Sequence, residues 1–371
     1  MRVVIAPDSF KGSITAAAAA AALAAGWRAS RPDDEVKQLP LADGGEGTLA
    51  VLAAADPGSR WHHVVVNGPC DGMVKAAWLE MTGNVAVVEL AAAAGLPLLG
   101  EPMPLDAHSF GVGELVGAAL NAGVRMVMIT LGGSACTDGG TGLLTALGAR
   151  FVDDTGHVLP LGGGALSRLA AVDLSGMRQP PAAGVSCLTD VRAPLLGAAG
   201  AAAVFGPQKG ASPADVVVLE TGLARLAGLL GGHPAEPGAG AAGGCGYALA
   251  TVWGARLLPG AVQIAATAGL PRALADADLV ITGEGRYDET SLTGKVVGTV
   301  AAMAARAGVP VALVAGSVAV PGSAGAVRGG QWPGPRSVEL TALAGGQQEA
   351  MTEPARWLTA AGRRLADAAA G

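Results

Sequence analysis

A chain of 371 residues, 51% of them hydrophobic, is long enough to form two domains with large cores. Its formal net charge of −6 and the lack of a lysine and arginine cluster argue against a nucleic-acid partner, and aromatic residues, at 3%, are too few for a base-stacking surface. The chain starts with a strand-like run, Met1–Ile5, and its alanine-rich run at 16–25 is too short for a membrane helix of about 20 residues. We therefore expect a cytoplasmic protein without a membrane partner.

Both ends of the chain show strands that alternate with helices. Near the start we expect strands at 3–6 and 36–41 and helices at 14–29 and 47–55. Toward the end we expect strands at 278–282, 309–315 and 338–343, and helices at 294–307 and 353–369. This alternation is typical of a parallel sheet covered by helices.

The middle of the chain has a different pattern. Three closely spaced strands separated by turn residues predict an antiparallel meander at 63–66, 74–81 and 85–90. Further elements are expected as a helix at 111–122, a strand at 125–131, a helix at 141–149, a hairpin turning at 153–156, a strand at 185–189, and helices at 213–230 and 244–257. Two Gly/Pro-rich stretches, 231–244 and 321–335, are expected to be surface loops.

The fold class predicted from these patterns is α/β with two domains. A Rossmann-like parallel-sheet domain is formed by both chain ends, 1–60 plus 275–371, and a second α/β domain, 61–274, is inserted between them.

Six segments rich in glycine, acidic residues or both each follow a predicted strand or precede a predicted helix. They span 6–13, 42–48, 132–142, 189–192, 238–244 and 282–288. Glycine lets backbone N–H groups approach an anion closely, and a helix that follows adds positive potential. Carboxylates in the same loops repel a bare phosphate but fit if Mg²⁺ or a hydroxyl substrate lies between. The combination predicts phosphoryl transfer.

The segment at 132–142 is the strongest of these signals. It holds five glycines, three hydroxyl residues and Asp138, more than an ordinary turn needs, which favours a loop around a polyphosphate or a small polyol. No Walker motif occurs in the chain. The segment 238–244 matches a dinucleotide pattern in letters, but it does not follow a strand and remains only a candidate anion site.

Two acidic motifs near the start of the chain have alternative explanations. Asp8 and Lys11 lie where the first strand ends, the edge at which parallel sheets bind ligands, or the segment only starts a helix capped by Ser13 or Thr15. Asp43 and the glutamate three residues later share one face if the backbone there is helical, or they cap the next helix.

Later motifs offer further charged groups. Asp190 ends a strand and could take a proton from a hydroxyl, bind Mg²⁺ or cap a turn, and Lys209 in a tight turn could contact phosphate. The predicted loop at 283–288 carries Glu284, Arg286 and Asp288 and is followed by Lys295, unless these residues only form a surface ion-pair cluster. Cysteines and histidines show no metal spacing, and no serine-nucleophile motif is present.

Taken together, the motifs resemble the glycerate kinase type 1 family. The similar segments occur in the family's order and cover nearly the whole chain, at 6–13, 42–48, 132–140, 205–211, 238–244 and 280–286. The resemblance implies ATP-dependent phosphorylation of D-glycerate, most often at its 2-hydroxyl, by a two-domain α/β protein with a cleft between the domains. The chain departs from the family at Ala193, where asparagine is usual, and at Ala107-His108, where a threonine pair or Thr-Ser is common.

This reading assigns roles to residues, with ATP and Mg²⁺ as cofactors and D-glycerate as the partner. The residues expected in catalysis are Asp190, Asp43, Lys11 and Arg286. Those expected to bind the substrate are Asp8, Ser9, Lys11, Arg286 and Ser134. Those expected to bind the nucleotide are Gly132, Gly133, Thr137, Gly139, Gly140, Lys209, Gly240, Gly283, Gly285 and Lys295. The expected metal ligands are Asp138, Glu284 and Asp288.

Two other functions stay open at this point. One is a non-catalytic protein that binds a small ligand on the same scaffold, and the other is a kinase of another small hydroxy acid. The sequence also leaves a homodimer open.

Overall fold

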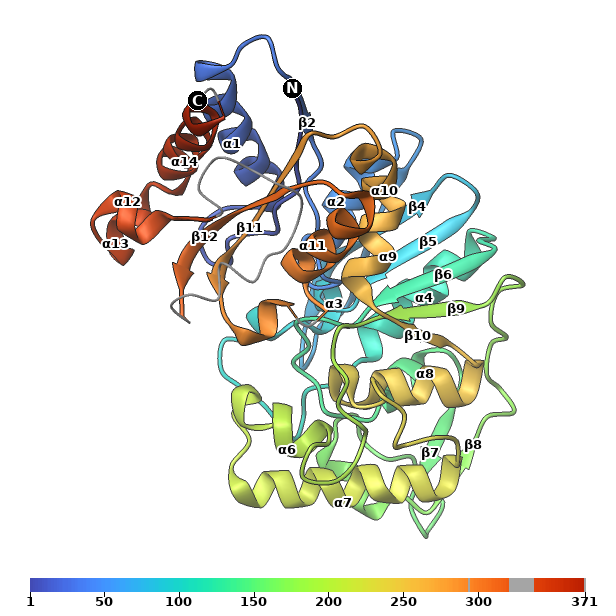
Figure 1. Ribbon diagram of the computed structural model, residues 1–371. Helices are drawn as coiled ribbons and strands as arrows, with labels where there is room; N and C mark the ends of the chain where they lie inside the picture. The colour runs from blue at the N-terminus through green and yellow to red at the C-terminus, as the bar shows by residue number, and fades with distance from the viewer. Residues whose placement is uncertain (293, 320–336, 370–371) are drawn as a thin grey trace. The chain divides into compact units, whose positions relative to one another are not determined.

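A computed structural model describes residues 1–292, 294–319 and 337–369 (Figure 1). The chain divides into two compact units, one formed by Met1–Asp43, Ala50–Ala55 and Gly260–Gly371 and the other by Gly44–Leu49 and Asp56–Pro259. The loop expected at 321–335 lies entirely outside the described residues. The division into a Rossmann-like domain, 1–60 plus 275–371, and an inserted domain, 61–274, stays a prediction. No helix in the described part of the chain combines the length and apolarity that crossing a membrane requires.

The first unit is built on a five-stranded sheet in the order β13-β12-β11-β1-β2, and every neighbouring pair is parallel. Its strands are β1 (Arg2–Ile5), β2 (Glu35–Gln38), β11 (Leu279–Tyr287), β12 (Val311–Val318) and β13 (Ser337–Glu339). The parallel sheet expected from the two ends of the chain is therefore confirmed.

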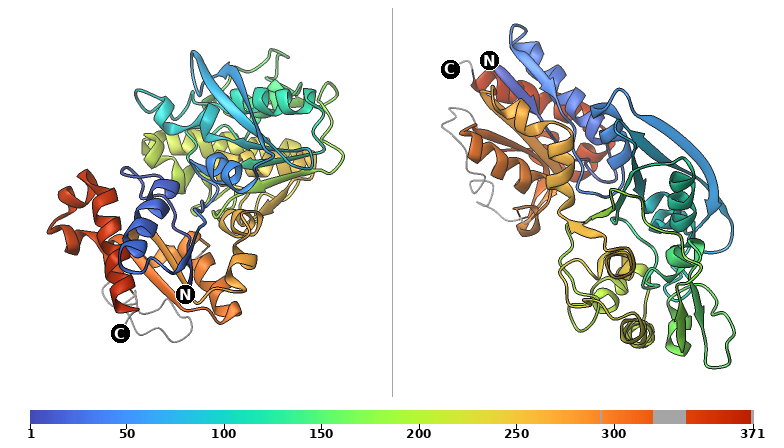
Figure 2. Two further views of the ribbon diagram at one scale, coloured as in Figure 1. Left: turned by 90° about the horizontal axis from the view of Figure 1, so that it is seen from above. Right: turned by 90° about the vertical axis from the view of Figure 1, so that its right-hand side faces the viewer.

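Helices cover both faces of this sheet because successive strand residues point to opposite sides. Val3 and Ile5 belong to a core with α1 (Ala16–Ser30) and α14 (Pro354–Ala368), which lie side by side in both views of Figure 2. Val4 and Ala6 belong to the opposite core, together with α9 (Gly260–Thr267), α10 (Leu270–Leu274) and α11 (Val296–Ala307).

The remaining helices of the first unit are short. They are η5 (Glu289–Leu292), α12 (Leu340–Ala344) and α13 (Gln347–Thr352), and α2 (Thr48–Ala55) spans the boundary between the units. The sequence prediction of a strand at 338–343 is wrong beyond residue 339, since the chain turns into α12.

The second unit contains a six-stranded sheet in the order β10-β9-β6-β5-β4-β3. Its strands are β3 (Arg60–Asn67), β4 (Met73–Met81), β5 (Val85–Glu89), β6 (Met126–Thr130), β9 (Val185–Leu188) and β10 (Arg256–Leu258). The predicted meander is confirmed, because β3, β4 and β5 pair antiparallel, while β5, β6, β9 and β10 pair parallel. A separate antiparallel pair is formed by β7 (Arg150–Val152) and β8 (Ala171–Asp173).

One continuous core fills the second unit around this sheet. Its helices are α3 (Ala91–Ala94), η1 (Leu96–Leu98), α4 (Phe110–Asn121), α5 (Thr141–Ala146), η2 (Gly164–Arg168), α6 (Ala201–Phe205), η3 (Pro207–Lys209), α7 (Pro213–Leu230), η4 (Ala241–Gly244) and α8 (Cys245–Trp253). The parallel strands direct their carboxyl ends to one edge, so the loops that follow them meet there.

Candidate active site

A pocket of about 370 Å³ opens in the first unit where β1, β2 and β11 end. The three strands are adjacent and parallel, which brings their following segments to one edge of the sheet. Charged side chains supply much of its lining: Asp8, Lys11, Asp43, Glu284, Arg286, Asp288 and Lys295. These residues come from three segments that are far apart in sequence, 8–11, 43 and 284–295, and the tertiary structure brings all seven into one site.

The segment 283–286 is not a loop, as the sequence suggested, but the end of strand β11. Pairing with β12 extends the strand, with Glu284 opposite Ala315 and Arg286 opposite Ser317. A side chain at Gly283 would overlap the carbonyl oxygen of Val314. Glycine here therefore permits tight strand packing, a different role from the phosphate contact that its sequence context suggested.

Asp8 lies beside this extended strand. Its backbone N–H donates to the carbonyl oxygen of Gly283 at 2.8 Å, and its carboxylate Oδ1 accepts from the Ser9 N–H at 2.6 Å. Burial, and next the negative charge of Asp43, raise the pKa of Asp8 to about 7. A carboxyl group with such a pKa changes charge near neutral pH, which suits a group that contacts a reacting hydroxyl.

Glu284 is the second buried carboxyl group of the pocket, with 8% of its surface exposed. Burial raises its pKa, and a hydrogen bond from the Ser291 hydroxyl opposes that shift. Its Oε1 atom has no hydrogen-bond partner among the described residues. A buried carboxylate oxygen without a partner is costly, so this atom points to a ligand beyond the described residues.

Three cations face these carboxylates. Lys11 is mostly exposed and places its Nζ 3.8 Å from Oδ2 of Asp43. Lys295 precedes the first residue of α11, and Arg286 is exposed at the end of β11. Asp288 accepts hydrogen bonds from the N–H and hydroxyl of Thr290, which hold its pKa below the usual range.

The start of the first helix follows the simpler of the two alternatives. The Thr15 hydroxyl accepts a hydrogen bond from the Ala18 N–H and caps α1. Lys11 nevertheless lines the pocket rather than only facing solvent. The segment therefore both caps the start of α1 and contributes a charged residue to the pocket.

The prediction that Asp43 and Glu46 share a helical face is wrong. Gly44 and Gly47 adopt φ angles of 95° and 90°, so the backbone turns before α2 begins. The carboxylate that caps α2 is Glu89, at the end of β5, whose Oε1 accepts from the Thr48 N–H at 3.1 Å. No local sequence signal marked Glu89, because its partner lies 41 residues away.

The second unit brings its glycine-rich loops together as well. The N–H groups of Gly132 and Gly139 donate to the carbonyl oxygens of Gly44 and Gly243. A side chain at Gly243 would overlap the carbonyl oxygen of Cys136. The high glycine content of these loops is thus explained in part by close contact of one backbone with another.

Asp138 lies at the centre of this loop cluster and is fully buried. Its Oδ2 atom accepts hydrogen bonds from the N–H and hydroxyl of Ser109, each at 2.8 Å, and from the Gly142 N–H. Its Oδ1 atom accepts from the Gly140 N–H at 3.0 Å. These bonds use both carboxylate oxygens to join the loop to α4 and α5.

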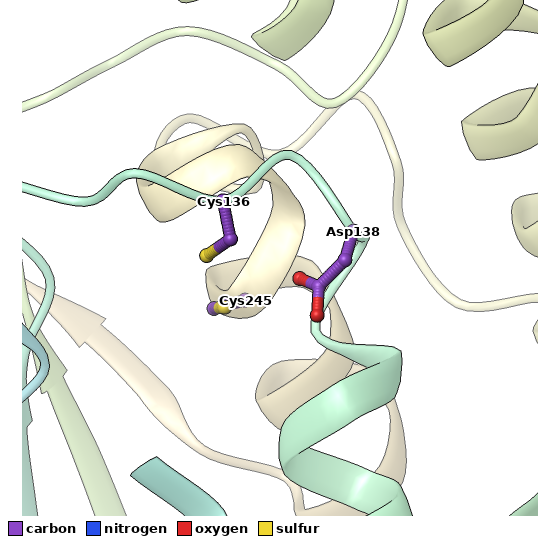
Figure 3. A group of neighbouring side chains, drawn as sticks. All are labelled: Cys136, Asp138 and Cys245. Atoms are coloured by element: carbon purple, nitrogen blue, oxygen red, sulfur yellow. The ribbon is translucent and has the colours of Figure 1, made fainter. Parts of the chain in front are cut away.

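Asp138 also lies near two thiols. Figure 3 shows Cys136, Asp138 and Cys245 pointing toward one another, and each offers an atom within 4.8 Å of the other two. A hydrogen bond with Cys136 and burial raise the pKa of the Cys245 thiol, which favours the protonated form rather than a metal-binding thiolate. The three ligand atoms lie close enough together to hold a metal ion, while the four hydrogen bonds that Asp138 accepts already occupy its carboxylate oxygens.

Lys209 lies in η3 and is buried, with 2% of its surface exposed. Its Nζ donates to Oγ of Ser134 at 3.0 Å and to the carbonyl oxygen of Cys136 at 2.6 Å. Burial lowers the pKa of this ammonium group. Lys209 therefore holds the 132–142 loop in place, a role that sequence reasoning did not assign to it.

Three further predicted residues lie in the same unit. Asp190 follows β9 and is half-buried. The N–H of Gly240 donates to the carbonyl oxygen of Ala193, so this donor is occupied within the protein. The hydroxyl of Thr137 is buried without a partner among the described residues and remains available for a ligand.

Comparison with known proteins identifies the family of this chain. A family model described as the glycerate kinase family matches residues 3–370. The chain is 41% identical to the glycerate 2-kinase of Escherichia coli K12 over 86% of each protein, and 43% identical to the glycerate kinase of Bacillus subtilis 168 over 86% of this chain and 85% of that protein. The chain therefore belongs to the glycerate kinase family.

A solved structure supports the same assignment. The crystal structure of a protein described as a glycerate kinase 2 from Salmonella typhimurium LT2 matches with a TM-score of 0.83 and 39% identity, and the match covers 99% of this chain and 97% of that one. The α/β fold class predicted from the sequence is confirmed.

Proposed function

We propose that this protein transfers the γ-phosphoryl group of ATP to the 2-hydroxyl of D-glycerate and forms 2-phosphoglycerate. The observation that carries the proposal is the pocket of the first unit, in which three cations and four carboxyl groups gather at the ends of adjacent parallel strands. Phosphoryl transfer depends mainly on positioning and charge neutralisation, and this set of groups provides both. The choice of glycerate as the phosphoryl acceptor rests on the relatives that are named glycerate kinase.

The substrate needs a cation for its carboxylate and polar groups for its hydroxyls. Arg286 suits the carboxylate, because a guanidinium can donate two parallel hydrogen bonds to it, and Lys11 is the second candidate. Asp8 and Ser9 line the same pocket and would hold the hydroxyl groups. Ser134, oriented by Lys209, is kept as a further substrate contact.

The residues of the pocket also fit a magnesium ion. Carboxylate oxygens are the ligands Mg²⁺ prefers, and Oε1 of Glu284 has no hydrogen-bond partner in the part of the chain that the structure describes. Glu284 and Asp288 would hold the ion, which when bound neutralises phosphate charge. The four hydrogen bonds of Asp138 favour a structural role for it instead.

Among the predicted nucleotide contacts, Lys295 and Gly285 line the pocket. Lys295 would contact phosphate oxygens as a point charge. In the second unit, the free hydroxyl of Thr137 and the backbone of Gly133 are the contacts we keep, since the N–H groups of Gly132, Gly139, Gly140 and Gly240 donate within the protein.

One carboxylate must accept the proton of the attacking hydroxyl as the new P–O bond forms and the bond to ADP breaks. Asp190 and Asp43 are the candidates. We expect Asp190→Asn to lower kcat by about 10²–10⁴-fold with an unchanged circular dichroism spectrum. Near-normal turnover would exclude Asp190 and leave Asp43 to be tested in the same way.

The direct test incubates the protein with ATP, Mg²⁺ and D-glycerate. We expect one ADP per phosphoglycerate, with the 2-phosphate identified by ³¹P NMR, and no comparable turnover with other small hydroxy acids. Binding of D-glycerate without release of ADP would instead favour the non-catalytic alternative. Faster turnover of another hydroxy acid would favour a kinase of that acid.

A further inference from the structure

The pocket of the first unit has a second part that the proposed chemistry does not use. It is formed by the short helices α12 and α13 and the residue that begins α14, through the side chains of Leu340, Thr341, Gln347, Ala350, Met351 and Pro354. We call these six residues the apolar wall. Four of them are apolar and none is charged.

The apolar wall has no role in binding either of the charged reactants. Glycerate carries an oxygen on each of its three carbons, and a triphosphate is charged throughout, so neither gains from contact with hydrocarbon. The pocket, at about 370 Å³, is also large for a three-carbon acid and falls in the usual range of about 300–1,000 Å³ for ligands of drug size. The apolar wall therefore suits a third, less polar chemical group.

The wall adjoins the charged part through β12. Arg286 pairs with Ser317 across β11 and β12, and both residues line the pocket. β12 in turn contacts α12 and α13. Gly316 precedes Ser317 in β12, and a side chain there would overlap the carbonyl oxygen of Gly285. Only glycine therefore lets β11 and β12 lie this close together. A ligand with a charged end and an apolar end fits across this strand.

We propose that the apolar wall binds the base of the nucleotide, an inference that rests on the proposed kinase function. Leu340 and Ala350 are 2% and 6% exposed and belong to the core against α1 and α14, so they form a rigid surface for the flat face of a base. Met351 is 46% exposed and supplies a flexible, polarisable side chain at the rim.

Gln347 provides a polar group for the edge of the base. Its amide both donates and accepts hydrogen bonds, the pattern that glutamine uses to recognise adenine. Its Nε2 donates a weak hydrogen bond to the Met351 sulfur at 3.8 Å, which a base edge can replace. The two exposed residues, Gln347 and Met351, therefore form the adjustable side of the subsite.

The chain offers matched controls for both residues. Gln348, the neighbour of Gln347 on α13, is also exposed but does not line the pocket. Met103 is 40% exposed, similar to Met351, and lies in the other unit. The test compares Gln347→Ala with Gln348→Ala, and Met351→Ala with Met103→Ala. Thermal melting establishes that all four variants are folded.

The measurements are the Kd of ATP, the Kd of inorganic tripolyphosphate and the KM of D-glycerate. We expect Gln347→Ala and Met351→Ala to weaken ATP about five- to thirtyfold, the effect of losing one hydrogen bond or one apolar contact. Tripolyphosphate binding and the KM of D-glycerate should stay at the wild-type value, and the controls should resemble the wild type throughout. Photolabelling with 8-azido-ATP should modify a peptide that covers 340–354.

The outcomes separate this inference from the proposed function. Unchanged ATP binding in both variants, with photolabel elsewhere, overturns the base subsite even if the enzyme phosphorylates glycerate. An equal rise in the Kd of ATP and the Kd of tripolyphosphate also overturns it, because the two residues would then contact the phosphates rather than the base. Selective weakening of ATP in a protein that does not phosphorylate glycerate supports the base subsite and overturns the proposed activity.

Discussion

Single buried charges decide how the loops of the second unit are held. Lys209 and Glu89 both place an ionisable group among backbone atoms of a glycine-rich loop. Glycine gives these loops their close contacts but no side-chain bonds of their own. A charged group from elsewhere in the fold therefore supplies the bonds.

The role of Lys209 can be separated from phosphate binding by the change Lys209→Met. The variant leaves the Ser134 hydroxyl and the Cys136 carbonyl oxygen without their donor, so we expect the free energy of unfolding to fall by about 1–3 kcal/mol. The measurement is urea denaturation without ligand. Lys75→Met, on exposed strand β4, is the control and should change little. An unchanged stability with a raised KM for ATP would instead show a phosphate contact.

Glu89 predicts a pH dependence of stability. Burial raises its pKa to about 7, so the folded protein binds a proton there that the unfolded chain, with the ordinary value of 4.5, has already lost. Its contribution to stability is complete below pH 4.5 and is lost as the pH rises through about 7. Glu89→Gln removes this pH-dependent loss of stability, and it keeps an oxygen that accepts the hydrogen bond from the Thr48 N–H.

We therefore expect Glu89→Gln to be more stable relative to wild type at pH 8 than at pH 5, by at most about 3 kcal/mol. Thermal melting at both pH values measures the difference. Glu101→Gln, in an exposed loop, controls for the loss of a negative charge. A difference that is the same at both pH values would contradict the raised pKa.

At the scale of elements, the contact of α1 with α14 depends on glycine. A side chain at Gly26 would overlap the carbonyl oxygen of Thr359, and one at Gly362 would overlap that of Leu23. The two helices can therefore approach backbone to backbone. This packing joins the two ends of the chain on one face of the sheet.

We expect Gly26→Ala to destabilise the protein by about 1–3 kcal/mol, although alanine is the better helix former. Gly228→Ala is the matched control, since it lies in α7 with no atom near the added carbon, and should stabilise by up to about 1 kcal/mol. Urea denaturation compares the two. Equal effects of both changes on the free energy of unfolding would show that helix propensity, and not contact with α14, determines the stability change at Gly26.

At the scale of the whole molecule, each unit has its own sheet and its own core. The sheet of the first unit combines strands from both ends of the chain, and three of them deliver charged residues to one pocket. The motifs near residues 8, 43 and 284 thus form one site, while those near 138, 209 and 240 form a second cluster in the other unit.

The alternation of strands and helices at both chain ends, the antiparallel meander, the family and the chemical class followed from the sequence alone, because hydrophobic periodicity and glycine-rich acidic motifs are local signals. The tertiary structure alone decided that 283–286 is a strand, that Glu89 caps α2 and that Lys209 is buried. Each of these depends on partners distant in sequence, namely β12, the loop before α2 and the 132–142 loop. Local propensity carries no information about such partners, since strand pairing and burial are set by the whole fold.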